Sequence, residues 1–174
     1  SERMPFSGVE YVDFFPSGTS TGFIDPSHEG VDYTAMAIGA MNFDRFIVAG
    51  FAWPKAWDDC LEDILSVIKA YRVACFAFET NGLGKHPVIL LRRMGARVDE
   101  WKSTENKHGR ILNAATGKQF IKLAQYLPPE LQTPAFRQAQ QTFNNMVLDY
   151  EYKAEHDDAP DALANLMKYV GLVK

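Results

Sequence analysis

The sequence contains only two cysteines, and they are far apart. Cys60 lies in a helix-like stretch and Cys75 in a strand-like one, and they form no CxxC pattern. The sequence also has no group of cysteines and histidines with the spacing of a zinc site. This usage favours two buried free thiols in a reducing compartment, and it argues against a disulfide framework or a cysteine-based metal site.

The sequence also lacks a secretory signal and any apolar run long enough to cross a bilayer. It has no excess of positive charge, because the net charge is -4 and the pI is near 5.5. That balance argues against indiscriminate nucleic-acid binding through bulk charge. It is compatible with a local basic rim, since acids gathered in a metal site would make the total negative. We expect a soluble, intracellular protein with no membrane partner.

Apolar residues, in contrast, are abundant. Hydrophobic residues make up 47% of the chain and aromatic residues 13%, a composition typical of globular proteins. A chain of 174 residues is long enough for one domain with a substantial core. Residues 1–20 form a leading segment without a predicted element, and no interdomain linker is visible. We therefore expect a single domain over residues 1–174.

Short apolar runs alternate with helix-like stretches, which indicates an α/β fold. The predicted strands are Thr21–Asp25, Tyr33–Ala40, Arg45–Trp53, Val73–Phe78 and Arg97–Trp101. The second and third of these are separated by residues 41–44 and predict an antiparallel hairpin. The fourth is almost continuously apolar, which suits a central strand that is buried on both faces.

Helical spacing and capping residues predict the helices. One helix begins at Pro54, and the others cover Pro87–Met94, Pro134–Met146 and Asp158–Val170. Thr133 is the expected N-cap of the third. We interpret Ser103–Arg110 as a mobile loop that leads into a short helix. The run Phe120–Tyr126 is compatible with either a strand or a helix.

Three acidic spots lie far apart in the sequence, each at the edge of an apolar segment. They are Asp25, Glu79 and the cluster of Asp157, Asp158 and Asp161. Each has an ordinary alternative: Asp25 fits a turn, Glu79 fits a cap or ion pair, and acids in a first helical turn stabilise the helix dipole. A carboxylate at the end of a buried strand is nevertheless costly unless a positive group meets it.

If these acids converge, they form a site for two hard divalent cations, because oxygen ligands suit Mg²⁺ or Mn²⁺ rather than Zn²⁺. Two such ions can activate water and stabilise the leaving oxygen when a phosphodiester is cut. Asp32 is a further candidate, although a turn residue at the start of a strand is the favoured interpretation. His156 abuts the acidic cluster and could orient it, although a surface histidine is favoured.

Basic residues also gather in the sequence, in segment 102–122. They are Lys102, Lys107, Arg110, Lys118 and Lys122. One interpretation is an ordinary solvated surface, and the other is a strip that contacts DNA phosphates. Lys107 and Arg110 are the preferred pair because their segment contains Gly109 and precedes a predicted helix.

Four motifs, in this order and spacing, resemble a known family. They are FIDPSHEGVDYTAMAIG, FETNGLG, KHGRI and HDDAPDALA, and the resemblance runs from about Gly22 to Val170. The chain resembles the C-terminal nuclease domain of the large terminase subunit of tailed bacteriophages. That resemblance implies a ribonuclease-H-like fold related to Holliday-junction resolvases. The expected fold is thus a mixed sheet, with an antiparallel hairpin and parallel strands, flanked by helices.

The resemblance also implies an activity: a Mg²⁺- or Mn²⁺-dependent endonuclease that cuts concatemeric double-stranded viral DNA. Asp25 and Glu79 would be catalytic metal ligands on adjacent strands. The last helix would supply the third ligand, for which Asp158 and Asp161 match the resolvase-like spacing and Asp157 competes. Lys107 and Arg110 would approach the DNA backbone.

The family further implies partners, which are an N-terminal ATPase motor in the same full-length protein, a portal protein and a small terminase subunit. The expected location is the cytoplasm of an infected bacterial host. This chain has no Walker motif, so we expect an isolated nuclease domain that does not hydrolyse ATP. Two alternatives stay open: a junction-resolvase-like nuclease on the same fold, and a docking module with weak activity outside its motor.

Overall fold

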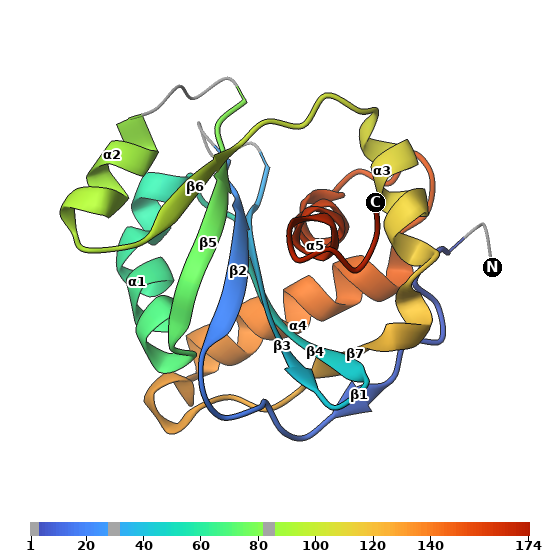
Figure 1. Cartoon of the computed structure of the whole chain (residues 1–174), viewed down its shortest axis with the longest axis horizontal. Helices are drawn as coiled ribbons and strands as arrows, with labels where there is room; N and C mark the ends of the chain where they lie inside the picture. The colour runs from blue at the N-terminus through green and yellow to red at the C-terminus, as the bar shows by residue number, and fades with distance from the viewer. Residues whose placement is uncertain (1–3, 28–31, 82–85) are drawn as a thin grey trace.

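A computed structural model describes residues 4–27, 32–81 and 86–174 of the chain. In these ranges the chain forms a seven-stranded mixed sheet with the order β1-β7-β4-β3-β2-β5-β6 (Figure 1). The strands are β1 (Tyr11–Val12), β2 (Ser20–Asp25), β3 (Thr34–Asn42), β4 (Arg45–Trp53), β5 (Val73–Glu79), β6 (Val98–Trp101) and β7 (Ile121–Ala124). The predicted α/β class with a mixed sheet is confirmed.

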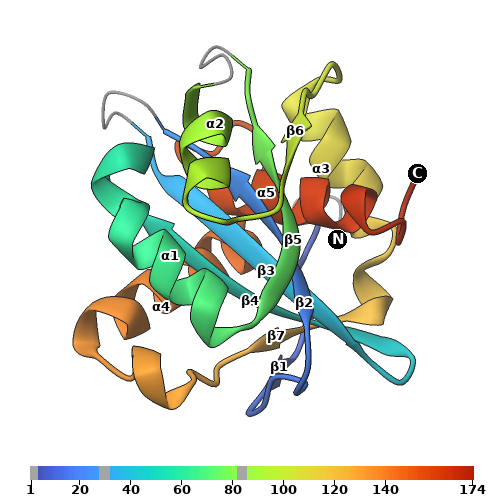
Figure 2. The same cartoon turned by 60° about the vertical axis from the view of Figure 1, so that its left-hand side comes forward.

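The predicted hairpin forms the long centre of the sheet. β3 and β4 are antiparallel and in register from Thr34↔Trp53 to Asn42↔Arg45, so residues 43 and 44 make the turn. β2 pairs antiparallel with β3 on one side and parallel with β5 on the other (Figure 2). The acidic ends of β2 and β5 therefore lie at the same edge of the sheet.

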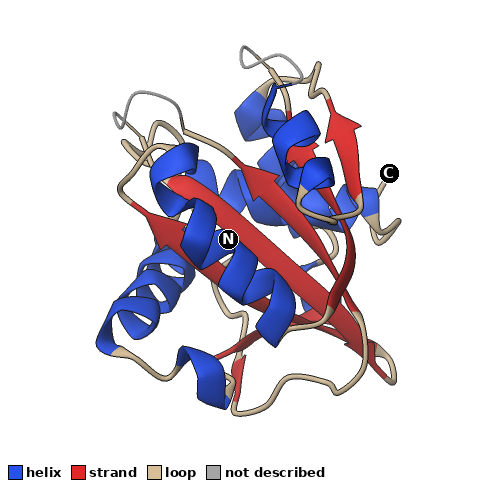
Figure 3. Ribbon diagram, turned by 90° about the vertical axis from the view of Figure 1, so that its left-hand side faces the viewer, coloured by secondary structure: helices blue, strands red, loops and turns tan. Residues whose placement is uncertain are grey.

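Helices cover both faces of the sheet (Figures 1 and 3). They are α1 (Leu61–Ala70), α2 (His86–Arg93), α3 (Lys107–Ala115), α4 (Pro134–Asp149) and α5 (Asp158–Tyr169). α1 and α2 pack on one face, and α3, α5 and most of α4 pack on the other. Within the described ranges, no helix combines the length and the apolar character needed to cross a membrane.

Alternation along the strands builds the two halves of the core. Ala35 and Ala37 belong to the cluster beneath α5, whereas Met36 and Ile38 belong to the cluster beneath α1. Successive side chains of a strand point to opposite faces, and in this part of β3 the small residues face α5 while the large ones face α1. The two alanines leave room for α5 over β3, and α5 also packs on β2, which brings its first turn to the acidic edge.

The ends of several elements differ from the predictions. The helix expected from Pro54 starts as a 3-10 turn at Trp57–Cys60 and continues as α1. α3 begins at Lys107, where the side chain of Asn106 accepts a hydrogen bond from the Gly109 N–H at 3.1 Å. Residues 107–110, the second half of the segment 103–110 that we interpreted as a loop, are thus the capped first turn of a helix.

Two further strands, one left open between strand and helix and one not predicted, occupy one edge of the sheet. The ambiguous run 120–126 contains β7, which pairs parallel with β4, and the leading segment contains β1, which pairs with β7. Thr133 caps α4 as predicted, accepting a hydrogen bond from the Phe136 N–H at 3.3 Å. Residues 28–31 and 82–84 of two quoted motifs lie outside the described residues.

Candidate metal centre

Asp25 and Glu79 end two neighbouring parallel strands. Ile24 of β2 is in register with Phe78 of β5, so the next residue of each strand emerges at the same point of the sheet edge. Only 6% of the Asp25 surface and 9% of the Glu79 surface are exposed. Two carboxylates are thereby held side by side, largely out of water.

Asp161 reaches the same place from the first turn of α5, which packs on β2 and β3. It is completely buried. One carboxylate oxygen from each of Asp25, Glu79 and Asp161 lies within 4.8 Å of the other two. The structure therefore brings together the three separate acidic spots, with Asp161 as the member from the last helix.

The positive groups that the structure describes compensate the buried carboxylates unevenly. The Oδ2 atom of Asp25 is buried and has no hydrogen-bond partner among the described residues. Burial and the adjacent charge of Glu79 raise the pKa of Asp25 well above its usual range. Burial also raises the pKa of Asp161, although Arg110 opposes this shift. A divalent cation would offset both costs, and an all-oxygen donor set fits Mg²⁺ or Mn²⁺.

Arg110 holds Asp161 in place. Its Nε donates to Asp161 Oδ1 at 2.9 Å and its Nη2 donates to Oδ2 at 3.1 Å, which is a bidentate pair. Its Nη1 donates to the Glu105 carbonyl at 2.7 Å, and only 6% of the residue is exposed. We expected Arg110 to contact DNA, but the structure engages its guanidinium inside the protein.

Lys107 lies in front of the same acids. Its Nζ is 3.2 Å from Asp157 Oδ1, 3.9 Å from Asp158 Oδ1 and 3.8 Å from Asp161 Oδ2. Burial opposes its charge, but the surrounding carboxylates outweigh this effect and raise the pKa of Lys107. Its side chain is still 38% exposed, so it connects the buried acids to the surface.

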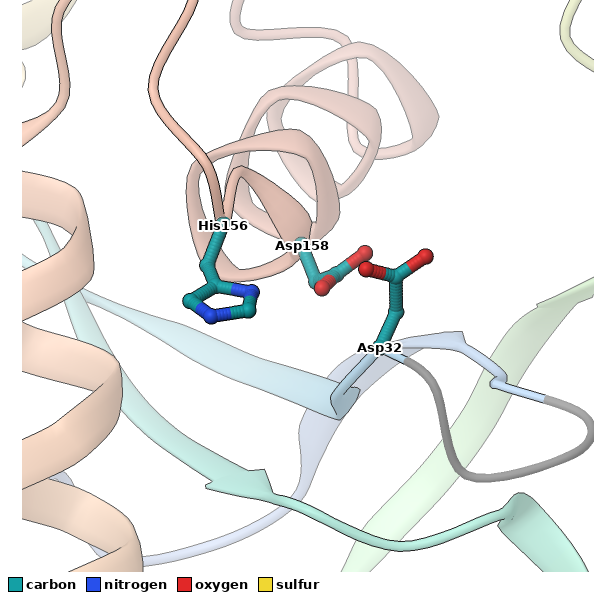
Figure 4. Close-up of side chains that lie close together, drawn as sticks. All are labelled: Asp32, His156 and Asp158. Atoms are coloured by element: carbon teal, nitrogen blue, oxygen red, sulfur yellow. The ribbon is translucent and has the colours of Figure 1, made fainter.

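Asp158 belongs to a different group from Asp161. Its Oδ2 accepts a hydrogen bond from the Tyr33 N–H at 3.1 Å, and its near neighbours are Asp32 and His156 (Figure 4). Burial raises the pKa of Asp158 to about 6. Asp157 precedes the helix and pairs with Lys107. Of the three aspartates we considered, the structure therefore places Asp161 with Asp25 and Glu79.

Lys118 and Lys122 of segment 102–122 do not lie in one strip with Lys107. Lys118 lies beyond the opposite end of α3 and donates to the Ser7 carbonyl at 3.0 Å. Lys122 lies on β7 and pairs with Glu10 at 2.6 Å. Lys102 is exposed directly after β6. These basic residues are close in the sequence, but Lys118 and Lys122 lie on other parts of the surface than Lys107.

We did not predict the residues that support the centre. Asn165 is completely buried, and its Oδ1 accepts hydrogen bonds from Trp101 Nε1 at 3.1 Å and Ser103 Oγ at 3.3 Å. It thereby ties α5 to the end of β6. The sequence offered one indication of this role: Asn165 lies one helical turn after Asp161, on the same face of the helix.

Comparisons with known proteins show which solved structures share this fold. No protein-family profile and no curated protein sequence matches the chain. Solved structures do match, among them the large terminase nuclease from thermophilic phage G20c with bound magnesium. That match has 13% identity and a TM-score of 0.62, and it covers 97% of this chain and 98% of that one. The fold is that of large terminase nuclease domains. The expected ribonuclease-H-like fold is confirmed.

Two other matches extend the comparison. The large terminase from another thermophilic bacteriophage has 12% identity and a TM-score of 0.59, and the match covers 92% of this chain but 43% of that one. The human cytomegalovirus terminase nuclease domain, in a structure soaked with manganese and bound to an inhibitor, has 13% identity and a TM-score of 0.55. That match covers 96% of this chain and 92% of the viral domain.

Proposed function

We propose that the chain is the metal-dependent endonuclease domain of a viral genome-packaging terminase. It would cut concatemeric double-stranded DNA by two-metal-ion phosphodiester hydrolysis. The observation that carries the proposal is the convergence of Asp25, Glu79 and Asp161 at one sheet edge, with a buried Asp25 oxygen that lacks a partner among the described residues. Similar folds are known with bound magnesium, zinc and cobalt, which supports a divalent ion here.

Asp25, Glu79 and Asp161 would hold the ions, Mg²⁺ or Mn²⁺. Bound there, two such ions supply an activated water and stabilise the leaving oxygen. Arg110 fixes both oxygens of Asp161 and thereby sets the direction of that ligand. A carboxylate held in this way loses less conformational entropy when an ion arrives. The role of Arg110 in this proposal is positioning rather than DNA contact.

Lys107 would meet the DNA. Its ammonium group contacts Asp157, Asp158 and Asp161 and is partly exposed, so it can turn toward a phosphate once ions neutralise those acids. Lys102, exposed after β6, would add a second phosphate contact. Lys118 lies beyond the opposite end of α3, away from the acids. It would contact DNA only if the duplex extends that far.

The partners follow from the same proposal. They are double-stranded DNA, an ATPase motor in the same full-length protein, a portal protein and a small terminase subunit. The match to the second phage's large terminase, which spans 43% of that chain, supports a further region in the full-length protein. The place of action would be the cytoplasm of an infected bacterial host.

A panel of substrates tests the proposal. Supercoiled plasmid, linear duplex and a four-way junction are each incubated with Mn²⁺, Mg²⁺ or EDTA. We expect metal-dependent nicking and linearisation of the plasmid and cutting of the duplex. A strong preference for the junction would instead support a resolvase-like nuclease. Absence of cutting with every metal by the folded chain would contradict the proposal and favour a docking module.

A further inference from the structure

A cavity lies at the end of the sheet that is opposite to the acidic edge. β5 starts beside the end of α1 and reaches the acidic edge at Glu79 (Figure 1). A strand of seven residues is roughly 20 Å long, so the start of β5 is far from the metal centre. The cavity beside that start has a volume of about 270 Å³. Rings form most of its wall, and they belong to Phe15, Pro16, Tyr71, Tyr126, Pro128 and Pro129.

The hydroxyl of Tyr71 in this wall is a buried polar group without a partner. Only 3% of the residue is exposed, and its Oη has no hydrogen bond to any residue that the structure describes. Phe15 and Phe51 hold the ring through edge-on contacts, with centroids 4.9 Å and 6.0 Å away. Burial raises the pKa of Tyr71, so the hydroxyl stays protonated and is a donor. A buried donor without an acceptor costs free energy, which a ligand with an acceptor would recover.

The next residue, Arg72, has a backbone conformation that favours glycine. Its φ is +52°, and it follows the C-cap of α1, where glycine is the common residue. Ser20 fixes this backbone, because its Oγ donates to the Tyr71 carbonyl at 2.8 Å and its N–H donates to the Arg72 carbonyl at 3.1 Å. An arginine in this conformation costs stability, which indicates a role for its side chain that glycine does not fill.

Positive charge gathers beside the rings. A second cavity, of about 440 Å³, adjoins the first and shares Arg72 and Glu130 with it, and Lys69 lines the second one. Both basic residues are exposed. Among the described residues, neither has a carboxylate in ion-pair contact. Two cations thus face one carboxylate, so a ligand with a single negative charge would complement this mouth.

We propose that the cavity binds a small carboxylic acid with an apolar body, either aromatic or branched. The apolar body would lie among the rings and prolines. One carboxylate oxygen would accept a hydrogen bond from the Tyr71 hydroxyl, and the Arg72 guanidinium would compensate the charge. The volume is close to the lower limit of about 300 Å³ for ligand pockets, which restricts the ligand to a small molecule.

This site is independent of the proposed nuclease activity, because it lies at the other end of β2 and β5 from Asp25 and Glu79. Its ligand would join three segments that are distant in the sequence: the turn before β2, the end of α1 and the segment after β7. A ligand that binds only the folded chain stabilises it, so binding should also raise the Tm.

Phenylacetate and isovalerate are the probes, and their neutral amides are the matched controls. Calorimetry on the unaltered chain should show one saturable site for at least one acid. The corresponding amide should bind at least about tenfold more weakly, because it lacks the charge that Arg72 meets. Absence of saturable binding by both acids would overturn the proposal, as would equal binding of an acid and its amide.

Two substitutions should separate binding from stability. Tyr71→Phe removes only the unpartnered hydroxyl, and Arg72→Gly places glycine in a conformation that it prefers, so neither should lower the Tm. Each should nevertheless weaken binding of the acid by about tenfold. Lys153→Gly is the matched control, because Lys153 has a φ of +63° and lies between α4 and α5, outside the cavity. It should leave the affinity unchanged.

Unchanged affinity in Tyr71→Phe or in Arg72→Gly would overturn the proposal. If either variant fails to fold, backbone amide chemical shifts of the unaltered chain decide the question. Titration with the acid should move the signals of residues 15–18, 70–72 and 126–130. Shifts confined to the acidic edge around Asp25 and Glu79 would overturn the proposal.

Discussion

At the scale of single residues, the bidentate pair between Arg110 and Asp161 decides how the centre is held. Both side chains are almost completely buried, and the arginine also donates to a backbone carbonyl. A buried ion pair contributes little net stability compared with apolar residues, but loss of one partner leaves an uncompensated charge. Arg110 is thus needed to neutralise the buried carboxylate of Asp161. That carboxylate in turn has a function only if it holds ions.

Arg110→Ala should destabilise the metal-free chain. It leaves Asp161 buried without its main partner, which should lower the free energy of unfolding by about 3 kcal/mol. Urea unfolding in EDTA near neutral pH measures this. Arg137→Ala, an exposed arginine on α4, is the matched control and should change stability by less than about 0.5 kcal/mol. Equal stability of the two variants would show that the Arg110 pair is not a structural requirement.

At the scale of elements, two glycines have opposite roles. A Cβ on Gly50 of β4 would lie 2.1 Å from the ring of Phe143, the completely buried residue with which α4 packs on the sheet. A Cβ on Gly109, in the first turn of α3, would meet nothing closer than an Asn106 oxygen at 3.9 Å. Gly50 is therefore fixed by packing, whereas Gly109 only weakens a helix.

Gly50→Ala should destabilise the chain by about 1–3 kcal/mol, because the buried ring cannot move aside without disturbing the core. Gly109→Ala should stabilise it by about 0.5 kcal/mol, because alanine favours the helix. Thermal unfolding of the two variants beside the unaltered chain measures both effects. A stabilised Gly50→Ala variant would contradict the described packing of α4 on β4.

The elements that could be predicted are those whose own sequence determines them. The β3–β4 hairpin consists of two apolar runs separated by a short segment, α5 has an acidic first turn, and Thr133 is a preferred cap. β1 and β7 have few residues each and exist because they pair with neighbours far away in the sequence. α3 was mistaken for a loop at its start because Lys107, His108 and Gly109 are polar or helix-weakening, and the cap by Asn106 was not recognised.

The same distinction applies to the site. Asp25 and Glu79 could be proposed from sequence because a carboxylate ending an apolar strand is unusual. The choice among Asp157, Asp158 and Asp161 could not be made, since it depends on how α5 is rotated against β2 and β3. The roles of Tyr33 and Asn165 were not visible, because ordinary aromatic and amide side chains acquire meaning only through their contacts. Arg110 was expected to contact DNA because it is basic, and the sequence does not show that its side chain is buried.

At the scale of the whole molecule, the acidic edge couples stability to pH. The pKa values of Asp25, Asp158 and Asp161 are raised, with burial as the first cause, so these groups hold protons more tightly in the folded chain. Stability from such groups is present below their unfolded pKa and is lost as the pH rises through the folded pKa. For Asp158 this window runs from 3.8 to about 6.

The metal-free chain should therefore have a lower Tm near pH 8 than near pH 5. Mn²⁺ should raise the Tm more near pH 8, because bound ions require deprotonated ligands. Differential scanning calorimetry with EDTA or Mn²⁺ at both pH values measures this. The carboxyls whose pKa values are lowered, Glu10 and Glu105, are on the surface and should contribute little. A metal-free Tm that rises across this range would contradict the described electrostatics.

The central claim is that the carboxylates at the ends of β2 and β5 hold catalytic metal, and one comparison tests it most directly. The rate of plasmid cleavage with Mn²⁺ is measured for Glu79→Gln and for Glu62→Gln, an exposed glutamate on α1 across the sheet. Mutation of a residue that supports a metal ligand typically lowers activity or metal affinity by about 10–100-fold. Loss of a ligand itself should therefore lower the cleavage rate by at least about 100-fold. We predict that loss for Glu79→Gln and an unchanged rate for Glu62→Gln, with both variants folded. Full cleavage by folded Glu79→Gln would contradict the account.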